Sequence, residues 1–176
     1  QHRQLRRSRR LSDQLLALAH ASRTGEGDQA PVVDLNQVAR DVVLQYLALA
    51  HEKDQDLGWR DARGDDAPEG EAPAPVVPVR AEAPELHELL ANLLHNAIRH
   101  VPRGGRITVS AGTRGMLAVA EVRDDGPGIP ADRHEAVFRR FQRDGTASTE
   151  PGPGDARGAG LGLAIARAYA RRHGGE

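Results

Sequence analysis

The segment NLLHNAIRH, residues 92–100, lies in a stretch whose apolar side chains recur at helical spacing. These apolar positions are Leu86, Leu89, Leu90, Leu93, Leu94, Ala97 and Ile98. Pro84 suits a first helical turn and Val101-Pro102 a helix end, so the sequence predicts one long helix between them. Asn92 and Asn96 are four residues apart, and their amides therefore project from the same side of that helix. Amide oxygens can complete the shell of a Mg²⁺ ion that phosphates already neutralise, although an isolated N-x-x-x-N pair is more often two ordinary surface amides.

A second segment, VRDDGPGIP at residues 122–130, directly follows a predicted strand. Asp124 at the strand end can accept a hydrogen bond from an exocyclic amine such as that of adenine. Gly126 and Gly128 would let the backbone approach a base, and Ile129 would supply an apolar wall. Asp and Gly also make plain turns, so D-x-G-x-G by itself is a weak signal.

A third segment, GAGLGLAI at residues 158–165, is a glycine-rich turn that enters a helix. Free N–H groups at a helix N-terminus bind phosphate, and glycines permit its close approach. The candidate phosphate-binding residues are Gly158, Gly160, Leu161, Gly162 and Leu163. Leu163 occupies the third glycine position of a dinucleotide fingerprint, and no Gly-Lys-Ser/Thr of a P-loop is present. By itself this segment fits a flexible hinge equally well.

Composition excludes several functional classes. The 176 residues are enough for one packed core plus an appendage. With a net charge of −1, the chain lacks the excess of positive charge that usually attracts proteins to nucleic acid. Only 3% of its residues are aromatic, so few side chains could stack on the bases of a single strand. The absence of Cys excludes disulfides and thiolate sites and fits a reducing cytosol. No apolar run is long enough to span a membrane, so we expect no membrane contact by this stretch.

The rest of the sequence predicts helices and strands that do not alternate as regular βαβ units, which favours one sheet with helices on one face. Residues 1–24 are basic and helix-compatible with one apolar stripe, and residues 25–33 form a linker. A helix over 35–51 begins at Asp34, a predicted N-cap with Gln37 as its capping-box partner. The other expected elements are strands at 56–59 and 76–80, a loop at 61–75, a hairpin of 106–111 with 116–123, a short helix at 131–139, a long loop at 144–158 and a helix at 161–173.

The three segments occur in the order of the N box, G1 box and G2 box of sensor histidine kinases, and the segment VFRRFQR at 137–143 resembles the F box of that family. The resemblance runs from about Leu11 to the end of the sequence. It implies the Bergerat ATP-binding fold, an α+β two-layer sandwich with a mixed sheet and helices on one face, preceded by a helix. Residues 1–24 would then be the end of a dimerisation helix and residues 34–176 the catalytic ATP-binding domain. Family domains continue into a final pair of strands, which we expect to be absent here.

The resemblance also implies roles for individual residues. Asn96 should ligate Mg²⁺, with Asn92 orienting phosphate or metal-bound water, and Asp124 should bind the amino group of adenine. Arg99 should reach phosphate, and His100, where an aromatic ring is commoner, should lie near the base. The glycines at 158, 160 and 162 should line the triphosphate. Arg140 and Arg143 are candidates for contact with the γ-phosphate, Arg143 being the better one.

Position 92 distinguishes classes among the proteins that share the Bergerat ATP-binding fold. Members that hydrolyse ATP carry a glutamate there to orient the attacking water, and Asn92 cannot act as that base. Phosphoryl transfer to a histidine is therefore the expected activity. The family acceptor motif H-E-L-R-T-P is missing, because neither His51-Glu52 nor His87-Glu88 continues with its residues.

We therefore expect a cytoplasmic kinase core that binds ATP and Mg²⁺ but does not phosphorylate itself. The full protein should be a membrane-attached homodimer that phosphorylates a histidine upstream and passes the phosphate to an aspartate on the receiver domain of a response regulator. Two alternatives remain. One is a serine kinase that regulates a sigma factor, and the other is a non-catalytic module whose nucleotide pocket stabilises a dimer.

Overall fold

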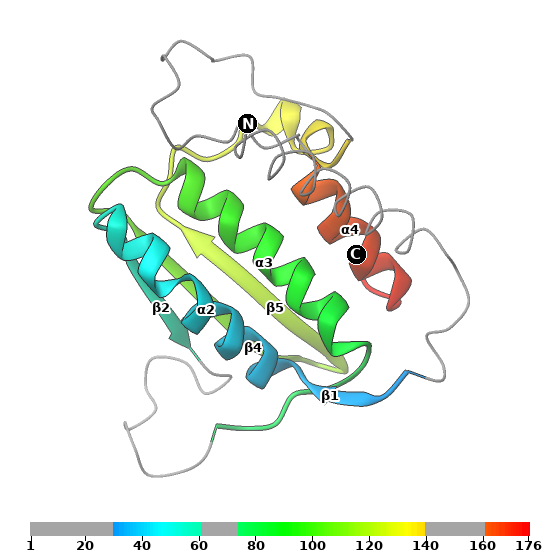
Figure 1. Ribbon diagram of the computed structural model, residues 1–176. Helices are drawn as coiled ribbons and strands as arrows, with labels where there is room; N and C mark the ends of the chain where they lie inside the picture. The colour runs from blue at the N-terminus through cyan, green and yellow to red at the C-terminus, as the bar shows by residue number, and fades with distance from the viewer. Residues whose placement is uncertain (1–29, 61–73, 140–160) are drawn as a thin grey trace, which may run out of the picture.

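The computed structural model describes residues 30–60, 74–139 and 161–176, in which helices pack in front of a small sheet (Figure 1). The helices are α2 (Leu35–Glu52), α3 (Ala83–His100) and α4 (Gly162–Arg172), with 3-10 turns η2 (Ala131–Arg133) and η3 (Ala136–Phe138). The strands are β1 (Val32–Asp34), β2 (Asp56–Arg60), β3 (Pro78–Arg80), β4 (Arg106–Arg114) and β5 (Leu117–Asp124).

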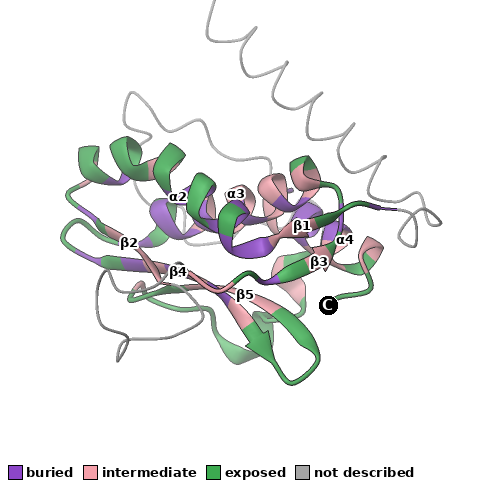
Figure 2. Ribbon diagram, turned by 90° about the horizontal axis from the view of Figure 1, so that it is seen from below, coloured by how far each residue is buried: buried purple, intermediate pink, exposed green. Residues whose placement is uncertain are grey.

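The main sheet has the order β2-β4-β5, and it is mixed because β2 runs parallel to β4 whereas β4 and β5 form an antiparallel hairpin. Strands β1 and β3 pair separately as a two-stranded antiparallel sheet. Figure 2 shows α2 and α3 stacked on one side of the main sheet, with the buried residues between the two layers. The α+β class, the mixed sheet and the helices on one face are thus confirmed.

Helix α2 begins where the sequence predicts, because Asp34 caps it. Asp34 Oδ1 accepts hydrogen bonds from the backbone N–H of Asn36 at 3.0 Å and from that of Val77 at 2.9 Å, which also ties the helix to the segment before β3. Gln37 does not reach back to the cap as expected. Its Nε2 instead donates to Asp41 Oδ1 at 2.8 Å, one turn along the helix.

The core forms on the apolar face that the sequence predicts for α3. Leu90, Leu94 and Ile98 are fully buried there. They belong to one cluster with Val42 of α2 and with Ile107 and Val109 of β4. Burial of these side chains contributes about 1.5–3 kcal/mol each, so the packing of α2 and α3 side by side on the sheet (Figure 1) supports the site described below.

The structure differs from the expected elements in several places. β3 is shorter than expected, because it begins at Pro78 and not at Val76. β1 begins at Val32, within the stretch predicted as linker. β4 runs to Arg114, so the hairpin turn falls on Gly115, whose φ of +62° suits glycine, and Met116. Residues 131–139 form two 3-10 turns in place of one helix, because no side chain between them is fully buried and packing does not support a longer helix.

The predictions for residues 1–29, 61–73 and 140–160 lie outside the described residues. They include the basic helix at 1–24, most of the linker and the loops at 61–75 and 144–158. Among the helices that the structure describes, none combines the length and the apolar character needed to cross a bilayer.

Candidate nucleotide-binding site

Asn92 of α3 and Gly162 of α4 lie against each other. Asn92 Nδ2 donates to the carbonyl oxygen of Glu88 at 2.9 Å, which fixes the amide orientation. A methyl group added to Gly162 would come within 3.1 Å of Asn92 Oδ1, closer than an ordinary van der Waals contact. The close approach of the two helices therefore depends on glycine at 162, and it brings the first and third sequence motifs together.

Asp124 stands at the end of β5 and shapes the turn that follows. Its Oδ1 accepts from the N–H of Gly126 at 2.9 Å. A methyl group on Gly126 would lie 2.7 Å from that same oxygen and 3.4 Å from Val101 Cγ2, so a larger residue there would displace the Asp124 carboxylate. Asp124 itself is exposed, and its carboxylate is accessible to a ligand.

Asp125 fastens this turn to the sheet. Its Oδ1 accepts from the N–H of Arg106 at 2.8 Å, and its own N–H donates to the Arg106 carbonyl at 3.2 Å. These bonds extend the β4–β5 pairing by one residue beyond the hairpin. The orientation of Asp124 is therefore set by the rigid end of the sheet.

The Asp124 turn and the Gly162 contact occupy two positions along α3. Gly126 lies near Val101 and the His100 carbonyl at the C-terminal end of α3, whereas Gly162 meets α3 at Asn92. Eight residues of helix separate Asn92 from His100, about 12 Å along the axis. That spacing is comparable with the distance between the base and the terminal phosphates of a nucleotide. Arg99 and His100 are exposed in the last turn of α3, beside the Asp124 turn.

The beginning of α4 offers backbone N–H groups. Leu161 is its N-cap, and this residue makes no side-chain cap hydrogen bond. The Leu161 side chain is fully buried with Ile165 and Tyr169, so a contribution of Leu161 to ligand binding comes from its backbone. Helix N-termini of this kind attract phosphate through their free N–H groups and the helix dipole.

The donor set fits a metal ion that arrives with its own anionic ligands. Within the described residues, no group of three or more His, Asp or Glu side chains could hold a metal alone. Asn92 and Asn96 provide neutral amide oxygens on the same side of α3, and both residues are partly exposed. Such oxygens suit Mg²⁺ when phosphates supply the negative charge.

The remaining predicted site residues divide into two groups. Gly128, with φ of +71°, and Ile129, 39% exposed, lie in the turn after Asp124, while Leu163 is half-buried in the first turn of α4. Four predicted residues, Gly158, Gly160, Arg140 and Arg143, lie outside the described residues.

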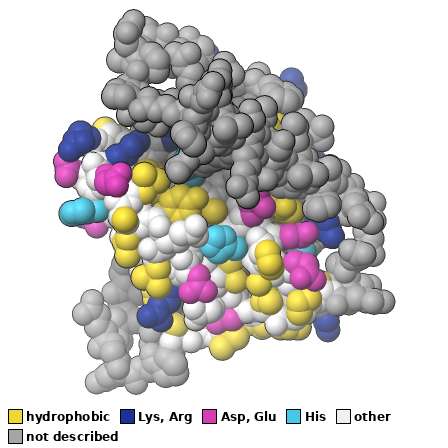
Figure 3. Space-filling model, in the orientation of Figure 1, with side chains coloured by type: hydrophobic (Ala, Val, Ile, Leu, Met, Phe, Trp, Pro, Cys, Tyr) yellow, Lys and Arg dark blue, Asp and Glu magenta, His cyan; other side chains and the backbone are white. Residues whose placement is uncertain are grey.

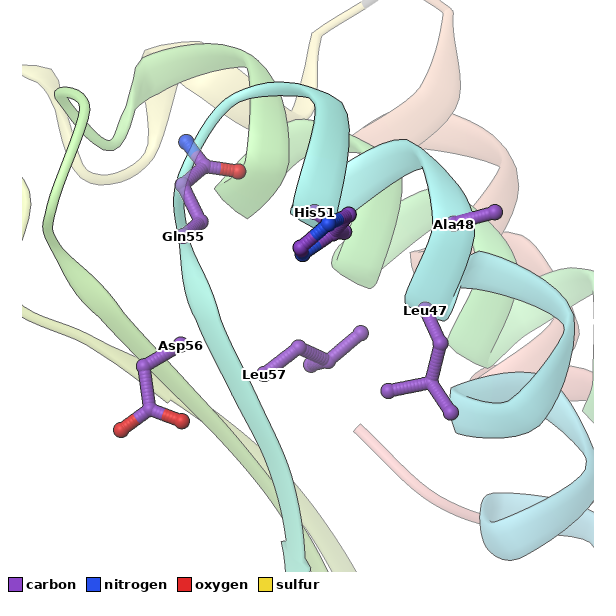
Figure 4. Close-up of a pocket in the computed structure, with 6 residues that line it drawn as sticks. All are labelled: Leu47, Ala48, His51, Gln55, Asp56 and Leu57. Atoms are coloured by element: carbon purple, nitrogen blue, oxygen red, sulfur yellow. The ribbon is translucent and has the colours of Figure 1, made fainter.

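A hollow of about 440 Å³ lies elsewhere, between the C-terminal half of α2 and the start of β2. Figure 4 shows Leu47 and Leu57 facing each other across it, while the Asp56 carboxylate points away from α2. Figure 3 shows hydrophobic side chains at the surface on the helical side of the molecule, and α2 contributes Leu44, Leu47 and Leu49 to the exposed ones. None of the residues that line the hollow belongs to the three motifs.

Motif reasoning missed two groups of contacts around α4. Arg167 of α4 contacts Glu135 and Phe138, and Arg172 with His173 contacts Glu85 at the start of α3. The partners are more than 25 residues apart in sequence, so no spacing rule connects them.

A mixed sheet with α2 and α3 on one side, together with an aspartate turn and a glycine-led helix at two points of α3, defines a nucleotide-binding α/β sandwich. Residues 81–176 match the family described as histidine kinase-, DNA gyrase B-, and HSP90-like ATPase. The chain belongs to that family, and the curated relatives it matches are named as sensor proteins and sensor histidine kinases. The resemblance inferred from the sequence is thus confirmed.

Among known proteins, the chain is similar to the probable sensor histidine kinase TcrY of Mycobacterium tuberculosis, with 36% identity over 166 residues that cover 94% of this chain and 31% of TcrY. The chain spans about a third of the length of the curated relatives it matches.

Two solved structures support the same fold. The mycobacterial sensor histidine kinase MprB has a TM-score of 0.61 at 25% identity, covering 82% of this chain and 80% of that one. Histidine kinase ThkA, solved in complex with response regulator protein TrrA, has a TM-score of 0.53 at 21% identity, covering 64% of this chain and 30% of that one. At its lower identity, the likeness to ThkA concerns the fold alone.

Proposed function

We propose that this chain binds Mg²⁺·ATP between the Asp124 turn and the start of α4 and presents the γ-phosphate to a histidine on a helix outside these 176 residues. The observation that carries the proposal is the contact of Asn92 with Gly162, because it joins the amide pair and the glycine motif at one place. The Asp124 turn lies about 12 Å along the same helix, where the base of a nucleotide would reach.

Each described residue has a defined task in this proposal. Asp124 accepts a hydrogen bond from the adenine amino group through the carboxylate oxygen that is not bonded to the Gly126 N–H. Ile129 and His100 border the base, and Gly128 gives the backbone room to approach it. The first N–H groups of α4, beginning at Gly162, bind phosphate, and Arg99 adds a positive charge near the end of α3.

Asn96 would hold the metal ion, with Asn92 beside it. When bound, Mg²⁺ neutralises phosphate charge and polarises the bond to the leaving group. The chain itself supplies orientation and electrostatic complementarity, which is most of what phosphoryl transfer requires from a protein. Asn92 carries no basic group to activate water, and transfer to an imidazole therefore outcompetes hydrolysis.

In the whole protein, we propose that the phosphate passes from the histidine to an aspartate of a response-regulator receiver domain, in a membrane-attached homodimer. The similarity to sensor histidine kinases such as TcrY supports the phosphotransfer part of this proposal. The chain spans a third of such relatives, so the acceptor and the partner surfaces belong to the whole protein.

The test uses ATP labelled on the γ-phosphate. We expect the chain to bind it in the presence of Mg²⁺, to release phosphate slowly, and to remain unlabelled. A dimerisation hairpin with an H-E-x-x-x-P motif from a related sensor kinase, added in trans, should acquire acid-labile phosphate. Acid-labile label on the chain itself, or rapid hydrolysis without an acceptor, would contradict the proposal.

A further inference from the structure

Arg167 of α4 touches two side chains of the segment 131–139, which we call the buttress segment. Its Nη1 donates to Glu135 Oε2 at 3.4 Å, and its guanidinium carbon lies 5.3 Å from the centre of the Phe138 ring. The Arg167 side chain is 29% exposed and that of Glu135 is 83% exposed, so the ion pair is largely solvated, whereas the contact with Phe138 is better shielded. A cation over an aromatic face and an ion pair are each worth a modest amount, and here they share one guanidinium.

The other side of the buttress segment is joined to the Asp124 turn. His134 Nε2 donates to the carbonyl oxygen of Ile129 at 2.8 Å. The Arg133 N–H donates to the Pro130 carbonyl at 2.9 Å, which closes the first 3-10 turn directly after Ile129. Movement of the buttress segment therefore carries the Asp124 turn with it.

Packing alone holds the buttress segment weakly. No residue between 131 and 139 is fully buried, and even Phe138 is 36% exposed. By contrast, α4 is fixed on α3 by Leu161, Ile165 and Tyr169, which are almost fully buried. Figure 1 shows η2 and η3 beside the beginning of α4, and η3 contacts that helix. Within the described residues, Arg167 supplies an ion pair and an aromatic contact that join this segment to α4.

We propose that Arg167 is a positioning residue for nucleotide binding, which acts by fixing the distance between the Asp124 turn and the N-terminus of α4 through Glu135 and Phe138. The inference rests on the proposed function, because it assumes that the base and the phosphates bind on these two sides. A nucleotide that contacts both sides binds best when their separation is already correct, since no binding energy is then spent on ordering the turn.

The experiment compares Arg167→Met, Phe138→Leu and the double variant with the wild-type chain. Arg171→Met is the matched control, because Arg171 lies on the same helix and is exposed. Two quantities are measured for each protein: hydrogen exchange of the amides of residues 131–139 without nucleotide, and the affinity for Mg²⁺·ATP by calorimetry.

We expect Arg167→Met and Phe138→Leu each to accelerate exchange in the buttress segment and to weaken ATP binding about tenfold. The double variant should lose little more than either single variant, because both remove the same contact. Arg171→Met should match the wild type in both measurements. An Arg that touched phosphate directly would instead give losses that add to those of Phe138→Leu.

Three outcomes would overturn the inference. They are unchanged exchange in Arg167→Met, additive losses in the double variant, and unchanged ATP affinity in a protein whose buttress segment has loosened. If the wild-type chain binds no ATP, the proposed function fails and the positioning role fails with it, whereas the exchange data still report whether Arg167 holds the segment.

Discussion

Single atoms decide the shape of the site. A hydrogen bond from the Gly126 N–H holds Asp124 Oδ1 in position. Gly126 has no side chain, and this leaves room for that oxygen. The missing side chain of Gly162 admits Asn92 Oδ1 in the same way. A side chain at Gly126 would displace the Asp124 carboxylate, whereas a side chain at Gly162 would crowd Asn92 Oδ1 less severely.

Tyr169 gives a prediction at the same scale. Burial, and then the negative charges of Glu88 and Glu85, raise the pKa of Tyr169 from 10.0 to about 12, and its hydroxyl donates to Glu88 Oε2 at 3.3 Å. The unfolded chain loses this proton near pH 10.0, whereas the folded chain keeps it up to about pH 12. The stability of the fold should therefore fall as the pH rises through that window.

The measurement uses Tyr46→Phe, which leaves Tyr169 as the sole tyrosine of the two in the chain. We expect the ultraviolet absorbance of tyrosinate to rise only near pH 12 or together with unfolding, which circular dichroism follows in the same samples. A tyrosinate signal with its midpoint near pH 10.0 in a still folded protein would refute the assigned environment.

At the scale of elements, α4 is anchored at its C-terminal end by a polar cluster on the first turn of α3. Glu85 Oε1 lies 3.3 Å from Arg172 Nη1, and Glu85 Oε2 lies 2.9 Å from His173 Nε2. The three side chains are between 6% and 16% exposed. Anchored there, α4 runs back along α3 and brings Gly162 to Asn92, so a distant ion pair helps to place the end of α4 that we propose binds phosphate.

This cluster predicts unequal effects for two neighbouring arginines. Arg172→Gln removes the arginine charge and leaves Glu85, 16% exposed, with His173 alone. We expect a loss of about 2–3 kcal/mol, less than for a fully buried pair whose charge is left without any partner. Arg171→Gln changes an exposed side chain and should cost less than about 0.5 kcal/mol. Urea unfolding of both variants measures the difference, and equal stabilities would show that the ion pair contributes nothing.

The sequence predicts the local parts of this molecule well and the long-range contacts poorly. The face of α3, the cap at Asp34 and the β4–β5 hairpin follow from periodicity and turn residues over short stretches. The contact of His173 with Glu85 spans 88 residues, and no pattern in either segment indicates the other. β1 is three residues long and exists because β3 pairs with it, so its own sequence carries too little signal.

The motif residues occupy an intermediate position. Asn92 and Asp124 stand out through the types and spacing of their neighbours, and the structure places their segments at two points along α3. Arg167 has no such signal, because an arginine on a helix is typical of a solvated face. Its partners become visible only once the buttress segment is placed against α4.

At the scale of the whole molecule, the two layers carry the two halves of the proposed nucleotide site. The sheet ends in the Asp124 turn, and the helical layer carries Asn92, Asn96 and the start of α4 (Figure 1). The buried core fixes the distance between the layers. In our proposal, the buttress segment fixes the distance between the Asp124 turn and the N-terminus of α4. A single ligand that spans both halves is the simplest reason for this arrangement, and an adenine nucleotide has the required chemistry at each end.

The most direct test of this account is the affinity of the Asp124→Asn variant for Mg²⁺·ATP, measured by calorimetry. Asn keeps an oxygen for the Gly126 N–H but turns an amino group toward the amino group of adenine, so two donors face each other. Asp125→Asn is the control, since its remaining oxygen can still accept from Arg106. We predict that Asp124→Asn loses about a hundredfold or more in affinity with an unchanged circular dichroism spectrum, while Asp125→Asn stays close to the wild type. Wild-type affinity in Asp124→Asn would contradict the account.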